Sequence, residues 1–303
     1  MSKIKFDPEM QLRRDKAAIL EGYITEYLFK KQFLDSKDPE TYSHGWWIGK
    51  YKNRKFLFVF REKLNHLDND IINRFKDDYN CWQVVNYNGV LRFYDIDNDE
   101  ISFSKDDFLG MYNSLYKGKP SKATKEVSNK ERQDRCIKFF NEHQLLDDIA
   151  LERDFVDNFL SVHFSSIINV DYFTKNDEGK YCVIEVKFKT EKPNGNFGLN
   201  KGEINLFDEL SSKGFTILHV ILYKDRQHKD LTILDYIDSN DIEKYWFYHY
   251  FKIEDIVSYG VAPEETSHDG NSKQEYGNIP KDIILNDERK IEFNVDLSVP
   301  EDA

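Results

Sequence analysis

One ten-residue segment, Tyr181 to Thr190, constrains the fold of this chain more than any other. Apolar and β-branched residues dominate it and turn-forming residues flank it, which predicts a β-strand. Side chains alternate between the two faces of a strand, so Glu185 and Lys187 share one face and point the same way. The opposite face is wholly apolar and consists of Cys182, Ile184, Val186 and Phe188.

A second apolar run, residues 167–173, lies just upstream and carries one carboxylate, Asp171. If the two runs form neighbouring strands, Asp171 and Glu185 could hold a hard divalent cation that keeps several waters. Such a cation activates water and polarises a phosphate, while Lys187 can orient the attacking water or stabilise the transition state. The set therefore favours phosphodiester hydrolysis. The alternative is that Glu185 and Lys187 lie on the exposed face of an edge strand.

The residues that follow favour a buried strand over an exposed edge. Asn200 and Glu203 form the pattern of a helix N-cap with an acidic residue at the third helical position. The next run, Phe215 to Tyr223, is apolar on both faces, as a central strand would be. His219 lies within that run, and we expect it to be a core histidine whose hydrogen bonds are satisfied.

This series of motifs resembles the PD-(D/E)xK nuclease superfamily, which includes restriction endonucleases, Holliday-junction resolvases and repair nucleases. The resemblance rests on Val170-Asp171-Tyr172, on Ile184-Glu185-Val186-Lys187, and on the helix and strand after them, and covers about residues 128–225. It implies a restriction-endonuclease-like α-β-β-β-α-β core with a mixed sheet.

Mg²⁺ dependence, with Mn²⁺ as a substitute, is also implied by this resemblance. The implied metal ligands are Asp171, Glu185 and the backbone carbonyl of Val186, and Lys187 is implied to be catalytic. Val170 stands where the family name expects proline, and the first core strand is not obvious.

The resemblance also implies assisting residues on the two helices of the core. Members often carry a glutamate on the first core helix; Glu131, Glu142 and Glu152 qualify by position, and Glu152 is slightly favoured. A residue on the helix after the Glu-x-Lys strand often assists. Lys201 and Glu203 are candidates, although Glu203 also fits the capping role.

The predicted fold class is α/β, or α+β overall. Residues 1–118 are expected to form an N-terminal α+β recognition or regulatory domain of hairpins and helices. Residues 128–253 would form the nuclease-like domain, and 254–303 an acidic extension. The best linker candidate is 117–130, and the second of two predicted hairpins turns at Asn88-Gly89. Apolar residues within 283–295 would allow the extension a short docked strand: Ile283, Ile284, Leu285, Ile291, Phe293 and Val295.

The first predicted hairpin alternates aromatic and basic residues, a pattern that could stack bases and meet phosphates. The aromatic members are Trp46, Trp47 and Tyr51, and the candidate nucleic-acid-binding residues are Lys50, Lys52, Arg54 and Lys55. The alternative is a hairpin with one core face and one solvated face. The net charge of −12 does not exclude a nucleic-acid partner, because the last fifty residues hold thirteen acidic and four basic residues.

The residues and the resemblance together predict a Mg²⁺-dependent endonuclease, a hydrolase acting on DNA, with RNA open as a substrate. A restriction or phage-defence setting is what the family resemblance implies. The alternative is a non-catalytic regulatory protein that keeps the fold and binds nucleic acid or protein. A homodimer, and a protein partner for the N-terminal domain or the acidic tail, are further expected partners. No apolar run reaches the length of a membrane span and the N-terminus lacks a signal core, so a cytoplasmic protein without a membrane partner is expected. Cys81, Cys136 and Cys182 are expected to be free thiols.

Overall fold

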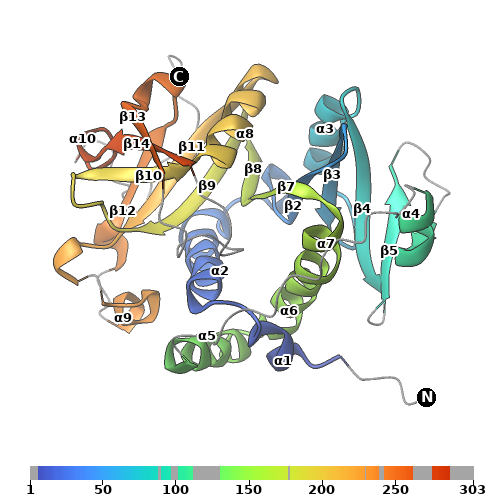
Figure 1. Ribbon diagram of the computed structural model, residues 1–303, viewed down its shortest axis with the longest axis horizontal. Coiled ribbons are helices and arrows are strands. Elements are labelled where there is room, and N and C mark those ends of the chain that lie inside the picture. Colours follow the sequence, from blue (N-terminus) through green and yellow to red (C-terminus); the bar gives the residue numbers. More distant parts are fainter. Residues whose placement is uncertain are drawn as a thin grey trace. The chain divides into compact units, whose positions relative to one another are not determined.

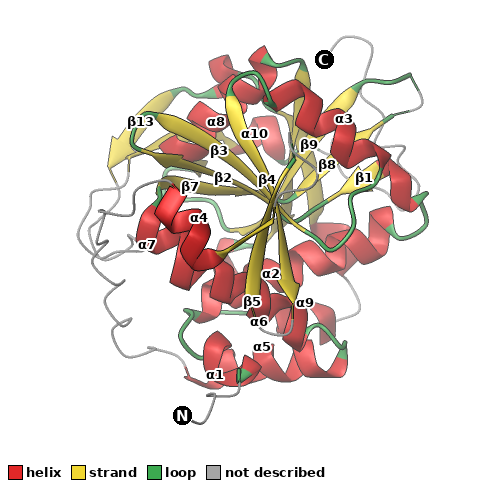
Figure 2. Ribbon diagram, turned by 90° about the vertical axis from the view of Figure 1, so that its right-hand side faces the viewer, coloured by secondary structure: helices red, strands yellow, loops and turns green. Residues whose placement is uncertain are grey.

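The computed structural model describes residues 6–87, 90–96, 102–111, 130–176, 178–228, 230–238, 242–261 and 275–286 (Figure 1). The chain forms two compact units, each assembled from two segments. Unit 1 consists of Met1–Tyr23 and His44–Asn169, and unit 2 of Ile24–Ser43 and Val170–Ala303. The boundaries of these units differ from those of the predicted domains. The helices within 130–163 belong to unit 1, and residues 24–43 belong to unit 2. The α+β class is confirmed by the helices and mixed sheets of both units (Figure 2).

Unit 1 contains a six-stranded mixed sheet in the order β6-β5-β4-β3-β2-β7. The predicted hairpins are confirmed as two antiparallel pairs, β2 with β3 and β4 with β5, and the turn at Asn88-Gly89 lies outside the described residues. Strands β3 and β4 run parallel, joined through helix α3 (His66–Phe75). The strand bounds are β2 (Trp46–Tyr51), β3 (Arg54–Phe60), β4 (Tyr79–Tyr87), β5 (Val90–Asp95), β6 (Ser102–Ser104) and β7 (Ser165–Val170). The predicted linker falls on residues outside the described part, apart from its last residue.

Aromatic side chains fill the core of unit 1. Phe58 meets Phe155 and Phe159 in edge-on contacts, with ring centroids 5.8 and 6.1 Å apart. Phe155 ends α6, and Phe159 lies on the π-helical segment Val156–Leu160 that continues it. Each fully buried ring of this size contributes roughly 1.5 to 3 kcal/mol to folding. The helices of unit 1 are α1 (Pro8–Leu12), α4 (Lys105–Met111), α5 (Lys130–Glu142), α6 (Leu146–Phe155) and α7 (Ser161–His163), besides α3 and the first half of α2.

Unit 2 contains a five-stranded sheet in the order β1-β8-β9-β11-β12. All neighbours are antiparallel except β9 and β11, which run parallel on either side of helix α8 (Lys201–Ser212) in the chain. The strand bounds are β1 (Tyr42–Ser43), β8 (Tyr172–Lys175), β9 (Tyr181–Lys189), β11 (Phe215–Tyr223) and β12 (Trp246–Tyr250). Helix α2 (Ala17–Phe29) precedes β1 in the chain, and α8 lies between β9 and β11; β10, which comes just before α8, belongs to another sheet. The helix and the strand that precede β8 in this sheet therefore lie within residues 17–43.

The two faces of this sheet are covered by different helices. Phe29 at the end of α2 packs on Tyr172 and Trp246, with centroids 5.9 and 5.8 Å away. On the other face, Phe207 of α8 packs on Phe251 at 5.2 Å. Alternation along β9 then directs the side chain of Glu185 to the face that α8 covers. The predicted apolar face of β9 is confirmed, since Cys182, Ile184 and Val186 are buried.

A second sheet of unit 2, in the order β10-β14-β13, joins segments far apart in sequence. Strand β14 (Glu275–Pro280) pairs with β10 (Asn196–Asn200) and with β13 (Ser258–Val261). The prediction of a docked strand within 283–295 was wrong for the described residues: the strand ends at Pro280, and α10 (Lys281–Ile284) follows it. Ile279 and Ile284 supply the buried contacts of this segment. The other predicted apolar residues, 291–295, lie outside the described part.

Two sequence predictions about composition can be compared directly with the structure. All three cysteines are buried free thiols, as predicted. Across the described ranges, none of the helices combines the length and apolarity needed to span a bilayer.

Candidate active site

Asp171 and Glu185 lie next to each other in unit 2. Asp171 lies at the junction between β7 and β8, so the apolar run 167–173 is divided between two strands. Tyr172 pairs with Ile184 in the antiparallel register of β8 and β9, so the preceding Asp171 lies beside Glu185. The Asp171 carboxylate accepts a hydrogen bond from the backbone N–H of Val186 at 2.7 Å. Only 3% of Asp171 and 2% of Glu185 is exposed, so this carboxylate pair is removed from water.

Lys187 connects the buried pair to the surface. Its Nζ forms an ion pair with Glu185 and lies 3.3 Å from Oε1 of Glu203 on α8. The exposed fraction of the Lys187 side chain is 24%, compared with 2% for Glu185. The ammonium group is thus held between two carboxylates at the point where the buried cluster meets solvent.

The electrostatics of the cluster are dominated by burial and by like charges. Burial, with the negative charge of Asp171 in addition, raises the pKa of Glu185 to about 8. Burial acts to lower the pKa of Lys187, but the carboxylates of Glu185, Glu203 and Asp171 outweigh it and raise this pKa well above its ordinary value. A neutral or partly protonated Glu185 beside a charged Lys187 follows. A bound cation would relieve the repulsion between the two carboxylates.

The N-terminus of α8 contributes a third carboxylate. Asn200 caps the helix, its side chain accepting from the N–H of Gly202, while Glu203 accepts from the backbone N–H of Asn200 at 3.1 Å. Burial opposes the charge of Glu203, but Lys187 and Lys189 outweigh burial and lower its pKa. Of the two predicted helix residues, Glu203 is the one that reaches Lys187. Lys201 is half exposed and pairs with Glu275 of β14.

His219 was expected to be a core histidine whose hydrogen bonds are satisfied. Its place in the core is confirmed, but the prediction of satisfied hydrogen bonds was wrong for the described residues. His219 is fully buried, but neither ring nitrogen has a hydrogen-bond partner among the described residues. It pairs with Glu185 in the β9–β11 register and with His249 across β12, so a row of polar residues crosses the sheet. Burial, and then the positive charge of Lys189, lowers the pKa of His219 well below its ordinary value. An unsatisfied buried group costs about 1 to 3 kcal/mol, so this neutral ring marks a strained place in the core.

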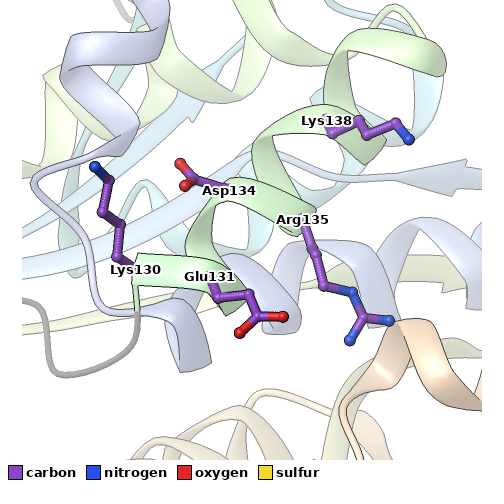
Figure 3. Close-up of a pocket in the computed structure, with 5 residues that line it drawn as sticks. All are labelled: Lys130, Glu131, Asp134, Arg135 and Lys138. Carbon is purple, nitrogen blue, oxygen red and sulfur yellow. The ribbon is translucent and has the colours of Figure 1, made fainter.

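The predicted upstream glutamates all belong to unit 1, whereas Asp171, Glu185 and Lys187 belong to unit 2. Glu152 on α6 accepts a hydrogen bond from the indole N–H of Trp47 at 2.9 Å. Glu142 ends α5 and pairs with Lys138 at 3.7 Å. Glu131 lines a shallow hollow on the same helix, where charged side chains project in different directions (Figure 3); its lining residues are Lys130, Glu131, Asp134, Arg135 and Lys138. The helix that precedes the first strand of the unit 2 sheet is α2.

The predicted nucleic-acid-binding residues lie on the β2–β3 hairpin of unit 1. Lys50, Lys52 and Arg54 are exposed and Lys55 is half-buried, with Lys50 opposite Lys55 in the register. The aromatic partners of the pattern are not on this surface. Trp46, Trp47 and Tyr51 are at most 8% exposed and belong to the core. Base stacking by these rings is therefore not available, because both faces of β2 are covered.

The oxygen atoms of Asp171 and Glu185 can be compared with the ligands that a magnesium ion requires. In the described part of the chain, no three His, Cys, Asp or Glu side chains are grouped closely enough to form a complete cation site. Magnesium does not need such a set, because it is commonly held by one or two carboxylates and retains several waters. Asp171 and Glu185, with the adjacent carbonyl of Val186, supply hard oxygen donors in that number. Burial and the repulsion by Asp171 together raise the pKa of Glu185, and a divalent cation bound between the two carboxylates would offset both effects.

Three residues of this region were missed by sequence reasoning or were given too little weight. Lys189 continues the alternation of Glu185 and Lys187, and this period of two was a signal that could have identified it. The contact of Glu203 with Lys187 can be recognised only in the folded structure, because the capping position of Glu203 does not reveal that β9 lies opposite. The position of His219 beside Glu185 can be recognised only from the register of β9 and β11. No family model matches the chain, and neither the curated proteins nor the solved structures compared with it include a match.

Proposed function

We propose that this protein is a Mg²⁺-dependent nuclease that hydrolyses phosphodiester bonds in DNA, with its site at Asp171, Glu185 and Lys187. The observation that carries the proposal is the buried carboxylate pair beside a lysine that reaches solvent. It is costly to ionise two neighbouring carboxylates that are excluded from water unless a cation joins them. A lysine next to such a pair is the further group that phosphoryl chemistry requires.

Each residue has a distinct role in the proposed reaction. Asp171 and Glu185 would hold Mg²⁺ together with the carbonyl of Val186. The bound ion would supply Lewis acidity and a water of lowered pKa. Lys187 would direct its Nζ–H bonds at the oxygens of the scissile phosphate, where negative charge increases in the transition state. Glu203 would keep that ammonium charged and in position from 3.3 Å away.

The topology of unit 2 adds support from outside the site. Its chain order of α2, β1, β8, β9, α8 and β11, with β9 and β11 parallel, matches the α-β-β-β-α-β order implied by the PD-(D/E)xK resemblance. Under this proposal the first core helix is α2, whose acidic residue within unit 2 is Glu26. The larger segment of unit 1, His44–Asn169, is then an insertion between the first and second core strands, and it is a candidate for the part that selects the substrate.

Cleavage assays over single-stranded, duplex and branched DNA and RNA, with Mg²⁺, Mn²⁺ or EDTA, test this function. We expect cleavage of DNA with either metal and none in EDTA, and loss of cleavage in Glu185→Ala with the fold retained by circular dichroism. Cleavage that persists in EDTA, or an active Glu185→Ala variant, would sink the proposal. Dimerisation and a restriction or defence setting are secondary parts of the proposal that this assay leaves aside.

A second candidate function has one observation in its favour. Lys187 is already paired with Glu185 and Glu203, so the cluster can neutralise part of its own charge without a metal. A non-catalytic regulatory protein that binds nucleic acid or another protein would show this arrangement permanently. Titration with Mg²⁺ separates the two functions: the nuclease binds the ion at Asp171 and Glu185, and the scaffold does not.

A further inference from the structure

Two more lysines lie beyond Lys187, toward the end of β9 in unit 2. Lys189 shares the face of Glu185 and Lys187, and Lys192 follows in the loop that leads into β10. Residues two apart on a strand are separated by about 6.6 Å, so the charges form a line that leads away from the buried carboxylates. Lys187 has carboxylate partners in this line, whereas Lys189 donates to the backbone carbonyl of Gly198 at 2.8 Å.

Lys192 is held in place by groups that leave its charge uncompensated. Its Nζ lies 2.9 Å from the ring centroid of Tyr276 and 3.1 Å from Oδ1 of Asn278. Asn278 is buried, and its amide donates to the Ser258 hydroxyl at 3.0 Å, which turns Oδ1 toward the lysine. The ammonium is therefore positioned by a ring face and an amide oxygen. A salt bridge from Lys192 to a carboxylate does not occur among the described residues.

Two glycines make this arrangement sterically feasible. A Cβ at Gly198 would lie 2.7 Å from both Cε and Nζ of Lys192. A Cβ at Gly260, which pairs with Tyr276 across β13 and β14, would lie 2.6 Å from the Tyr276 hydroxyl. With glycine at both positions, the ring of Tyr276 can approach β13 and the end of the Lys192 side chain can approach β10 as closely as they do.

The charges of Lys189 and Lys192 repel each other at Gly198. Lys189 bonds to the carbonyl of Gly198 while Lys192 lies against its Cα, so the two ammonium groups approach the same residue. Burial and the positive charge of Lys189 lower the pKa of Lys192 to about 8. An anion between the two lysines would relieve this repulsion, and both side chains are partly exposed to receive one.

We propose that Lys189 and Lys192 form a phosphate-binding subsite for the nucleic-acid strand, next to the phosphodiester that the Asp171–Glu185–Lys187 site would cleave. The inference rests on the proposed function, because that function supplies the strand. The subsite would take a backbone phosphate one or two nucleotides from the scissile bond. It contributes binding and register, and no step of the reaction.

Oligonucleotide binding in EDTA tests the subsite without cleavage. The probe is a fluorescein-labelled single-stranded DNA 20-mer, with the RNA of the same sequence as a second probe, measured by fluorescence anisotropy over a salt series. Lys192→Met keeps the apolar stem on Tyr276 and removes the charge, while Lys192→Arg keeps the charge. Lys180→Met is the matched control, because Lys180 lies just before the other end of β9 and its side chain forms a surface ion pair with Glu178 at 3.6 Å.

We expect Lys192→Met to weaken binding about three- to tenfold at low salt and to reduce the slope of log K against log salt by about 0.7. Lys192→Arg and Lys180→Met should bind like the wild type, and melting temperatures should confirm that every variant is folded. Unchanged affinity and slope in Lys192→Met would overturn the subsite, as would a wild type that binds neither probe. A weakened Lys192→Met in a protein that cuts nothing with Mg²⁺ would uphold the subsite and refute the nuclease.

Discussion

Each of the two units buries a cluster of carboxylates with a cation, and the clusters differ in how completely they are satisfied. In unit 1 the guanidinium of Arg153 bonds both oxygens of Asp15, at 2.9 and 2.6 Å, and also Asp157 at 2.7 Å. Gln11 and Gln133 complete that network by donating to Asp157 and to the backbone carbonyl of Asp15. In unit 2 the ammonium of Lys187 faces three carboxylates, and neither ring nitrogen of the neighbouring His219 has a hydrogen-bond partner within the part of the chain that the structure describes.

The difference separates a structural use of buried charge from a functional one. The planar fork of Arg153 matches its carboxylates and joins α6 to Asp15 in the turn that follows α1, so nothing further is needed there. Lysine offers a point charge that cannot satisfy a carboxylate pair in the same way. The carboxyl pKa values of the two clusters differ in the same sense. Burial raises the pKa of Asp157 to about 6, and burial together with the charge of Asp171 raises the pKa of Glu185 to about 8.

The largest expected effect on stability comes from removing Arg153, the cation of the unit 1 cluster. Arg153→Met would leave Asp15 and Asp157 buried without a counter-charge and should cost about 3 to 5 kcal/mol of unfolding free energy. Lys187→Met should cost clearly less, because Glu185 can take up a proton and lose its charge. Urea unfolding at pH 7 measures both, and equal losses would remove the distinction between the clusters.

The next largest difference between the clusters should be their effect on the increase in melting temperature that Mg²⁺ causes. At a hundred times its dissociation constant, a ligand that binds only the folded state adds about 2.7 kcal/mol of stability. Mg²⁺ should therefore raise the melting temperature of the wild type, and Asp171→Asn should abolish the increase. Asp157→Asn changes a partly buried carboxylate of unit 1 and should keep the increase in melting temperature that Mg²⁺ causes. A metal response that survives in Asp171→Asn would place the ion elsewhere.

The pH dependence of stability should single out Glu185. Its folded pKa of about 8 lies above the ordinary value of 4.5, so the folded state binds more protons between these values. Its contribution to stability is complete below the lower value and is lost as the pH rises through the upper one. In EDTA, the wild type should lose on the order of 1 to 3 kcal/mol relative to Glu185→Gln between about pH 5 and 9. Parallel curves for the two proteins would contradict the shifted pKa.

The smallest expected effect compares two capping boxes of the same design. On α3, Asp68 accepts from Asn65 and pairs with Arg61 at 2.7 Å; on α8, Glu203 accepts from Asn200 and pairs with Lys187. Glu203→Gln keeps the capping pattern, so it should cost less than about 1 kcal/mol and slow cleavage several-fold. Asp68→Asn should lower stability and leave the cleavage rate per folded molecule unchanged. A slowed Asp68→Asn variant would show that the cleavage rate responds to helix capping in general.

Local patterns in the sequence predicted the local parts of the fold and of the site. The period of two in β9 predicted the shared face of Glu185 and Lys187, and Asn200 predicted the start of α8. Pairings between distant segments had no such signal. Tyr42 and Ser43 pair with Thr174 and Phe173, and Pro280 pairs with Asn196, through backbone bonds that any sequence can make. The contact of Glu203 with Lys187 and the position of His219 beside Glu185 likewise depend on how α8 and β11 lie against β9, which local patterns do not reveal.

The central claim is that the unsatisfied cluster of unit 2 is a metal-dependent phosphodiester site. The rate of Mg²⁺-dependent DNA cleavage by Lys187→Met, beside the wild type and Lys180→Met, tests it most directly. We predict a loss of about 10²- to 10³-fold or more in Lys187→Met, with unchanged circular dichroism and wild-type rates in Lys180→Met. A Lys187→Met variant that cuts at the wild-type rate would contradict the claim.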